Sequence, residues 1–193
     1  DHTGDCKAPC FKACPTHQDI QGYVGLIANG ETEEAIKVIK KDNPLPRSIG
    51  RVCPHPCEEA CRRSHLEGAV SICSLKRFAG DEYSDYIPEC EEKNGKKIAV
   101  VGGGPAGLSC AYFLLLKGYS VDIFEAEEKA GGMLRFGIPA YRLPKDVLDK
   151  EIENIEKMGA QFNYNKKLGR DFTITSLKND YDAIFVATGA WKS

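Results

Sequence analysis

Six of the nine cysteines fall into two groups with the same internal spacing. They are Cys6, Cys10 and Cys14, followed by Cys53, Cys57 and Cys61. Three residues separate successive cysteines, so one loop or helical turn can direct several thiolates at one point. Cys14 and Cys53 each precede a proline, as cluster-binding cysteines often do. We therefore predict that these six cysteines bind iron–sulfur.

Two other interpretations of the cysteines stay open. Four cysteines can hold zinc, although zinc motifs usually have gaps of two residues rather than three. The cysteines could also be free thiols. Disulfides suit a secreted scaffold, which we do not expect, because no signal peptide is visible in this sequence. Of the single cysteines, Cys90 is expected to be free and Cys110 to lie in the core.

A second chemical motif is Gly102-x-Gly104-x-x-Gly107. Residues 98–101 before it form an apolar, β-branched run typical of a buried parallel strand. Residues 106–117, which begin within the glycine motif, are predominantly apolar and predict a buried helix. This order of strand, glycines and helix is the dinucleotide-binding fingerprint.

Each glycine has a separate expected task. Gly102 would permit the tight turn, Gly104 the approach of a pyrophosphate, and Gly107 the close packing of helix on strand. The free N–H groups of the helix would hold the phosphates. Glu125 ends the next predicted strand, 21 residues after Gly104, where an acid accepts hydrogen bonds from ribose. The alternative is a glycine-rich turn without a ligand.

The first ninety residues have helical patterns only. We predict a loop before residue 18, a connector at 43–46, and a short helix after Pro56. Longer helices are predicted over 19–29, 31–41 and 70–83. This region has few apolar residues for a core of its size, which suggests that it needs a metal for stability. We assign residues 1–90 to a helical cluster-binding domain.

Residues 81–95 are polar and predict a linker, and residues 96–193 predict a Rossmann-like domain with a parallel sheet. In that domain we expect strands at 120–125, 161–164 and 182–189, the last one buried. Residues 131–139 predict a glycine-rich loop and 144–158 a helix, while 173–180 fit a helical turn or a loop. The expected fold class is an all-helical domain followed by a partial α/β domain.

The net charge of −2 and the pI near 6.1 give no indication of a nucleic-acid or anionic-membrane partner. No apolar run reaches the ~18–20 residues that span a bilayer. We expect a cytoplasmic protein. The sequence begins at Asp1 and stops soon after a predicted strand, so we expect it to be part of a longer chain. No set of residues suggests a general acid, base or nucleophile, so no catalytic residue is predicted.

Several short motifs occur in a recognisable order over the whole chain. They are Cys10-x-x-x-Cys14-Pro15, Gly50-Arg-Val-Cys53-Pro54, Cys57-Glu58, Cys61, Val100-Val-Gly-Gly-Gly-Pro-Ala-Gly107, Gly131-Gly132-Met133, Phe136-Gly-Ile-Pro139, Arg142-Leu-Pro144 and Val186-Ala-Thr-Gly189. With these motifs the sequence resembles the small (β) subunit of bacterial glutamate synthase and, equally, the N-terminal half of dihydropyrimidine dehydrogenase.

The resemblance implies a helical domain with two [4Fe–4S] clusters, then an FAD domain into which an NAD(P)H domain is inserted after the Ala-Thr-Gly strand. Electrons would pass from NAD(P)H to FAD and singly through the clusters to a partner subunit or domain. The residues that it implies for FAD are Gly102, Gly103, Gly104, Pro105, Ala106 and Gly107 at the pyrophosphate, Glu125 at the ribose, Gly132, Met133 and Arg142 along the flavin, Leu168 at the adenine end, and Thr188 and Gly189 over the cofactor.

Matching of the cluster ligands is less complete. One cluster would use Cys14, Cys53, Cys57 and a Glu or Gln, where this sequence has Lys76, a poor iron ligand. Cys73, one helical turn earlier, is a possible replacement. The other cluster would use Cys6, Cys10, Cys61 and a cysteine before residue 6, where none occurs. We therefore expect one [4Fe–4S] cluster, with two possible.

Residues 108–193 contain no second Gly-x-Gly-x-x-Gly, so NAD(P)H is expected to bind only in the full-length protein. The leading interpretation is part of an NAD(P)H-dependent, FAD- and iron–sulfur-containing oxidoreductase with a redox partner. The alternatives are a non-catalytic scaffold subunit and a zinc-stapled FAD-binding module.

Overall fold

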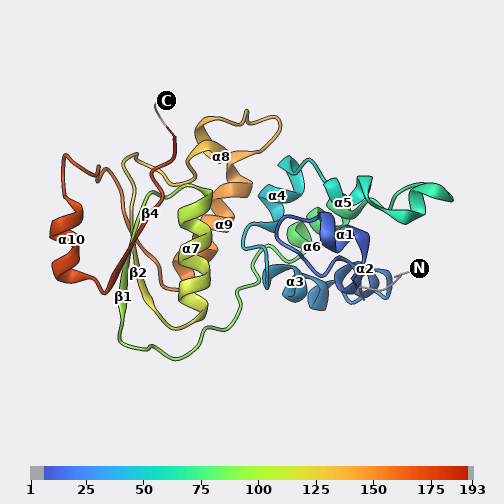
Figure 1. Cartoon of the computed structure of the whole chain (residues 1–193), viewed down its shortest axis with the longest axis horizontal. Helices are drawn as coiled ribbons and strands as arrows, with labels where there is room; N and C mark the ends of the chain where they lie inside the picture. The colour runs from blue at the N-terminus through green and yellow to red at the C-terminus, as the bar shows by residue number, and fades with distance from the viewer. Residues whose placement is uncertain (1–6, 191–193) are drawn as a thin grey trace. The chain divides into compact units, whose positions relative to one another are not determined.

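The computed structural model of the 193-residue chain describes residues 7–190, which pack as two compact units divided after Tyr86 (Figure 1). Each unit has its own secondary-structure class. The first contains only helices in its described part, and the second contains a parallel sheet with helices. The predicted fold class is therefore confirmed.

The helices of the first unit are short. They are α1 Pro9–Ala13, α2 Ile20–Ala28, α3 Thr32–Lys40, α4 Pro46–Val52, α5 Pro56–Glu59, the 3-10 helix η1 Arg62–His65, and α6 Ile72–Glu82. The prediction of a loop before residue 18 is wrong in part, because α1 forms there, and α4 was not predicted. Both helices begin with a proline, whose fixed φ suits the first helical position.

A small apolar core joins the helices of this unit. Its fully buried centre includes Tyr23, Ile36 and Ile39, and Cys57 belongs to the same cluster of buried residues. Cys10 and Cys14 pack against this core from the side. Thiols thus take the place of apolar side chains along one boundary of the core.

A charged contact connects α4 to α6. Arg51 makes two hydrogen bonds to Asp81, from Nη1 to Oδ1 at 3.0 Å and from Nη2 to Oδ2 at 2.9 Å. Arg47 Nε donates to Asp81 Oδ1 at 3.0 Å. Gly50 and Arg77 lie against each other where the helices meet, and a Cβ on Gly50 would lie 2.8 Å from that of Arg77. The contact fixes the helix that ends at Cys53 against the helix that carries Cys73.

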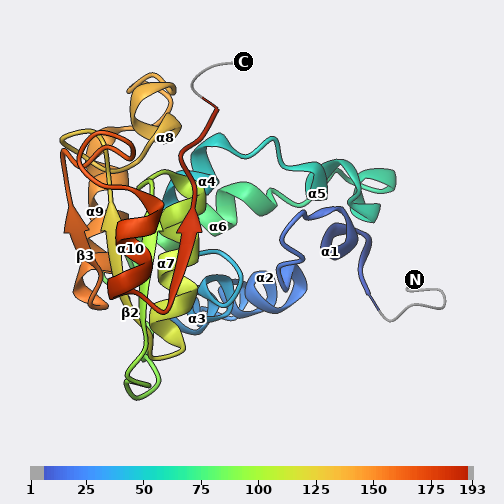
Figure 2. The same cartoon turned by 60° about the vertical axis from the view of Figure 1, so that its left-hand side comes forward.

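The second unit alternates strands and helices. They are β1 Lys97–Val101, α7 Pro105–Leu116, β2 Ser120–Phe124, α8 Met133–Phe136, α9 Lys145–Lys157, β3 Gln161–Asn163, α10 Ile174–Asp180 and β4 Ala183–Val186. All strand pairs are parallel, in the order β3-β2-β1-β4. Figures 1 and 2 show α7 and α9 on one face of the sheet and α10 on the other. This is the doubly wound arrangement.

Two local expectations for this unit need correction. The residues predicted as the 131–139 loop include the short helix α8. The prediction of a buried strand at 182–189 is wrong, because Phe185 is 40% and Val186 53% exposed. In the described part of the chain β4 is the last strand of the sheet, so only β1 pairs with it, and Ile184 packs on the α10 side.

Candidate cofactor sites

The carboxyl ends of β1, β2 and β4 meet at one edge of the sheet, where Gly102, Glu125 and Ala187 follow them directly. Gly102 N donates to Phe124 O at 2.8 Å, and Ala187 N donates to Val101 O at 2.8 Å. Ligands of open α/β sheets bind outside this edge. The sheet therefore brings the predicted turn, acid and Ala-Thr-Gly segment together.

Gly102 and Gly107 leave no room for a side chain. The φ of Gly102 is +110°, and a Cβ there would lie 2.3 Å from Ala187 O. A Cβ on Gly107 would lie 1.9 Å from Gly102 O. These distances support the tight turn and the close helix packing expected of the two glycines.

Gly104 is different, because a side chain there would have room. It is the N-cap of α7, and the nearest atom to a Cβ built there is Gly132 Cα, 3.8 Å away. Pro105 and Ala106, in the first turn of α7, are exposed. A helix N-terminus with an open approach over a glycine fits a pyrophosphate, because its N–H groups and dipole favour negative charge.

The carboxylate of Glu125 accepts hydrogen bonds from the backbone of the glycine turn and of the loop after β2. Its side chain is buried, with Oε2 accepting from Gly103 N at 2.8 Å and Oε1 accepting from Glu127 N at 2.9 Å. Each carboxylate oxygen can accept a further hydrogen bond. The predicted ribose contact remains chemically open, and the structure adds a role in ordering the main chain that sequence reasoning missed.

The Gly131-Gly132 loop lies directly against the turn. Gly131 N donates to Gly103 O at 2.8 Å. Gly132 has a φ of +49°, and a Cβ on it would lie 2.9 Å from Gly104 Cα. The loop therefore borders the open space above Gly104, as its predicted place beside the cofactor requires.

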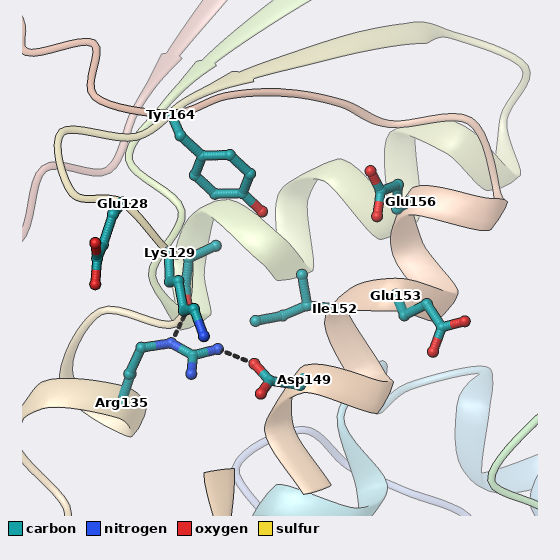
Figure 3. A pocket seen from close by; sticks show the side chains of 9 residues that line it. Glu128, Lys129, Arg135, Asp149, Ile152, Glu153, Glu156 and Tyr164 are labelled. Carbon is teal, nitrogen blue, oxygen red and sulfur yellow. Dashed lines mark hydrogen bonds and ion pairs between the residues drawn. The ribbon is translucent and has the colours of Figure 1, made fainter. Parts of the chain in front are cut away.

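Arg135 anchors this loop. Its Nε donates to Ala130 O at 2.6 Å, and its guanidinium forms an ion pair with Asp149 on α9. Figure 3 shows both contacts at the wall of a hollow of about 310 Å³, which Tyr164 and the acids of α9 also line. None of the predicted cofactor residues lines this hollow.

The other predicted cofactor residues are spread around the sheet edge. Met133 is 62% exposed, and Arg142, Thr188 and Gly189 are exposed as well. Leu168 bridges to Phe172 and packs with the side chains on the α10 face of the sheet. The exposed residues are thus free to contact a ligand, whereas Leu168 is partly engaged in packing.

In the helical unit, the ends of separate helices supply the thiols. Cys14 follows α1, Cys53 follows α4, Cys57 is the second residue of α5, and Cys73 is the second residue of α6. Cys6 lies outside the described residues. The four thiols therefore come from the ends of four separate helices.

Electrostatic effects show which thiols are neighbours. Burial raises the pKa of the Cys57 thiol to about 11; Lys76 opposes this, and the Cys14 and Cys53 thiolates add to it. Burial also raises the pKa of the Cys73 thiol. The charge of Lys76 lowers this pKa, and the charge of Cys53 raises it. The buried Lys76 is therefore close enough to Cys57 and Cys73 for its charge to act on both thiols.

Tyr23 is a buried neighbour of several of these thiols. Its side chain is 1% exposed. Its pKa is raised, first by burial and then by the neighbouring charges of Cys57, Cys14, Cys73 and, most weakly, Cys10. Sequence reasoning treated this tyrosine only as part of a helix.

The remaining described thiols, Cys10 and Cys61, form a second neighbourhood. Burial raises the pKa of Cys10, backbone hydrogen bonding lowers it, and the charges of Cys61 and Cys14 raise it further. Cys10 is thus close enough to both Cys61 and Cys14 for their charges to act on it, and the grouping of the cysteines that the resemblance implies stays a prediction.

Each Cys-Pro segment contains a histidine with a positive φ and a polar contact to its cysteine sulfur. His17, three residues after Cys14, and His55, two residues after Cys53, have positive φ values of 50° and 47°. His55 N donates to Cys53 Sγ at 3.3 Å, and Cys14 Sγ lies 3.4 Å from Thr16 Oγ1. Hydrogen bonds to ligand sulfurs are one of the ways a protein sets a cluster potential.

Within residues 7–190, no three His, Cys, Asp or Glu side chains are grouped closely enough to hold a single metal ion. An iron–sulfur cluster does not require such a group, because each of its thiolates binds a different iron. The donor set fits such a cluster in chemistry, since thiols are the ligands that it takes.

No helix in the described part of the chain is both long enough and apolar enough to cross a membrane.

Comparison with known proteins agrees with this division of the chain. Residues 3–86 match the family described as dihydropyrimidine dehydrogenase domain II, 4Fe-4S cluster. Residues 100–163 match the NAD(P)-binding Rossmann-like domain. The predicted cluster-domain class and dinucleotide-binding fold are therefore confirmed.

Relatives match nearly the whole chain. It is 44% identical to the NADP(+)-dependent formate dehydrogenase subunit beta of Moorella thermoacetica over 94% of this chain and 29% of the relative. It is 43% identical to the NADPH-Fe(3+) oxidoreductase subunit beta of Geobacter sulfurreducens, over 96% of this chain and 29% of the relative. It is 36% identical to the glutamate synthase [NADPH] small chain of Escherichia coli, over 100% of this chain and 42% of the relative. The chain spans less than half the length of each.

Proposed function

Since the chain joins a 4Fe-4S domain of the dihydropyrimidine dehydrogenase type to a Rossmann-like domain, as glutamate synthase small chains and their relatives do, we propose that it is the FAD- and cluster-binding part of an NAD(P)H-dependent oxidoreductase. The full-length protein passes electrons to a redox partner subunit. Two relatives are named as beta subunits, which supports such a partner. Cytoplasmic location is proposed with it, because the cysteines require reducing conditions.

The proposed domain division follows the predicted one. Residues 1–90 bind the cluster or clusters, and residues 96–193 bind FAD. FAD supplies the conversion of a hydride into two single electrons, and a cluster relays them one at a time. The chain itself supplies binding, burial and hydrogen bonds rather than acid–base chemistry.

The assignment of residues to FAD starts from Gly104. Its open approach and the N-terminus of α7 take the pyrophosphate, together with the glycines of the turn. Glu125 takes the ribose, and the exposed side chains of Met133 and Arg142 lie toward the flavin side. Thr188 and Gly189 follow the edge strand, where they can cover the cofactor.

The charge of Glu125 supports FAD over NADPH at this turn. A carboxylate suits free ribose hydroxyls, whereas the 2′-phosphate of NADPH calls for a cationic side chain. The hydrogen bond from Gly103 N holds the Glu125 carboxylate against the glycine turn, which supports its assignment to the ribose. NADPH is therefore expected to bind another part of the longer protein.

One observation carries the proposal for the first unit. The charges of Cys14 and Cys53 both act on the buried thiol of Cys57, although Cys14 lies far from the other two in the sequence. We propose that these three cysteines hold one [4Fe–4S] cluster, and that Cys6, Cys10 and Cys61 contribute to a second.

The test is the stoichiometry of the chain purified without oxygen. We expect a brown protein with about four or about eight irons, equal acid-labile sulfide, and about one FAD per chain. Zinc without sulfide would instead support the zinc-stapled module. Retention of NADPH in place of FAD would contradict the assignment of the glycine turn.

A further inference from the structure

Cys73 lies at the junction of two cluster-binding segments, although it belongs to neither cysteine triplet. It is 8% exposed, and its Sγ lies 3.4 Å from Gly50 O, to which the thiol donates, and 4.0 Å from Ile49 O. Both carbonyls belong to the last turn of α4, which ends at Val52, directly before Cys53. The Cys73 side chain is therefore directed toward the segment that presents Cys53.

The main chain of Cys73 is tied to the other segment. Cys73 N donates to Glu58 Oε1 at 2.7 Å, and Glu58 directly follows Cys57. This bond fixes the start of α6 against α5. One residue thus contacts the neighbours of Cys53 through its side chain and the neighbour of Cys57 through its backbone.

A cluster with four irons takes four protein ligands, and cysteine is the usual one. Cys14, Cys53 and Cys57 supply three, and Cys73 is a further buried cysteine whose thiol lies against the last turn of α4 and whose backbone is bonded to the residue after Cys57. We propose that Cys73 is the fourth thiolate ligand of this cluster and that the Lys76 ammonium is its compensating charge. The inference rests on the proposed function, since it presupposes a cluster in this unit.

Lys76 lies where a cation could compensate the charge of the cluster. It lies one helical turn after Cys73 and is 5% exposed, which is rare for a lysine without a nearby negative charge. Its charge acts on Cys14, Cys57 and Cys73. An oxidised cluster with four thiolates carries a net negative charge, which stabilises a buried cation.

Gln18 is the competing ligand. It is 4% exposed, its Nε2 lies 3.9 Å from Cys14 Sγ, and its Oε1 has no hydrogen-bond partner among the described residues. An amide oxygen is a weaker iron ligand than a thiolate, and Nε2 also donates to Thr16 Oγ1 at 3.1 Å. We assign Gln18 to hydrogen bonding at Cys14 instead.

The test compares Cys73→Ala with Cys90→Ser in the whole chain, purified without oxygen. Cys90 is an exposed thiol in the second unit and serves as the matched control. Removal of one cysteine ligand leaves one iron unheld, so we expect iron in this cluster to fall from about four to about three. The oxidised variant then gains the EPR signal of a three-iron cluster, which the control lacks.

A double variant makes the assignment specific. The double variant Cys57→Ala with Cys73→Ala should lose at most the iron and sulfide of one cluster, because both residues bind the same cluster. Gln18→Ala should keep the iron and EPR spectrum of the control. Lys76→Met should keep the four irons and lower the midpoint potential, because a nearby cation favours the more negative, reduced cluster.

Several results would overturn the inference. They are an unchanged EPR spectrum and iron content in Cys73→Ala, loss of the cluster in Gln18→Ala, or an unchanged potential in Lys76→Met. Far-UV circular dichroism separates misfolding from ligand loss, and Cys73→Ser, which keeps the side-chain size, should fold while showing an altered EPR spectrum. If Cys90→Ser itself holds no iron or sulfide, the proposed function fails rather than this assignment.

Discussion

Gly104 and Gly107 are three residues apart, yet the space around them predicts opposite effects of the same substitution. A Cβ at Gly104 would meet only Gly132 Cα at ordinary contact distance, 3.8 Å. A Cβ at Gly107 would overlap Gly102 O at 1.9 Å. The space beside Gly104 is therefore available to a ligand, whereas the space beside Gly107 is filled by the backbone of Gly102.

We expect Gly104→Ala to change the free energy of unfolding by less than about 1 kcal/mol, because its φ of −77° suits alanine. FAD affinity should fall at least about tenfold, or about 1.4 kcal/mol, because the methyl group occupies the approach of the pyrophosphate. Urea unfolding and flavin titration measure the two quantities.

Gly107→Ala is the matched comparison and should cost about 3 kcal/mol in unfolding free energy, because backbone atoms cannot give way cheaply. An FAD affinity for Gly104→Ala equal to that of the natural sequence would contradict the pyrophosphate assignment. A stable Gly107→Ala protein would contradict the packing described here.

At the scale of elements, the packing of α4 on α6 decides where Cys53 and Cys73 lie. Asp81 receives hydrogen bonds from both Arg47 and Arg51 across this contact. Burial alone would raise the pKa of Asp81, but the hydrogen bonds and charges of Arg51 and Arg47 outweigh it and hold the pKa below its usual value. The contact is therefore stronger when Asp81 is ionised.

Asp81→Asn should lower the unfolding free energy of the first unit by about 1–2 kcal/mol at pH 7. A lowered folded pKa contributes stability above the unfolded value of about 3.9, and this contribution is lost as pH falls through the folded pKa. Denaturant unfolding followed from pH 7 to pH 3 should therefore show the two proteins converging in acid.

Glu33→Gln provides the control, because Glu33 pairs with Lys37 on the exposed surface of α3. Such a pair contributes about 0–1 kcal/mol. A difference between Asp81→Asn and the natural sequence that stays constant down to pH 3 would show that the charge of Asp81 does not stabilise this contact.

At the scale of the whole molecule, the chain contains one glycine fingerprint and two compact units. The exposed Phe185 and Val186 on β4 show that the sheet has a free edge in the described part of the chain. One dinucleotide site means that FAD and NADPH cannot both bind in the way proposed. We therefore expect the hydride donor to bind outside these residues.

We expect the flavin bound to this chain to stay oxidised when NADPH or NADH is added without oxygen. Dithionite, which needs no binding site, should bleach it fully and serves as the positive control. The absorbance of the bound flavin is the measurement. Steady oxidation of NADPH by this chain would show that the second dinucleotide site lies within these 193 residues.

The local sequence pattern was sufficient to predict the glycine turn after β1. Strand, glycines and helix are consecutive in the sequence, and the backbone requirements of Gly102 and Gly107 are met within a few residues and one neighbouring strand. The two cysteine triplets were likewise visible as spacing. Cys-Pro segments and glycine turns carry their geometry in the order of their residues, so sequence alone predicted both kinds of site.

The tertiary structure decided how these parts meet. Only the packing of α4 on α6 places Cys73 beside the carbonyls that precede Cys53, and only the folded turn shows Glu125 hydrogen-bonded to Gly103. The exposure of β4, predicted as buried, depends on its position in the sheet. Contacts between residues distant in sequence depend on how helices and strands pack, and the spacing within one segment does not contain that information.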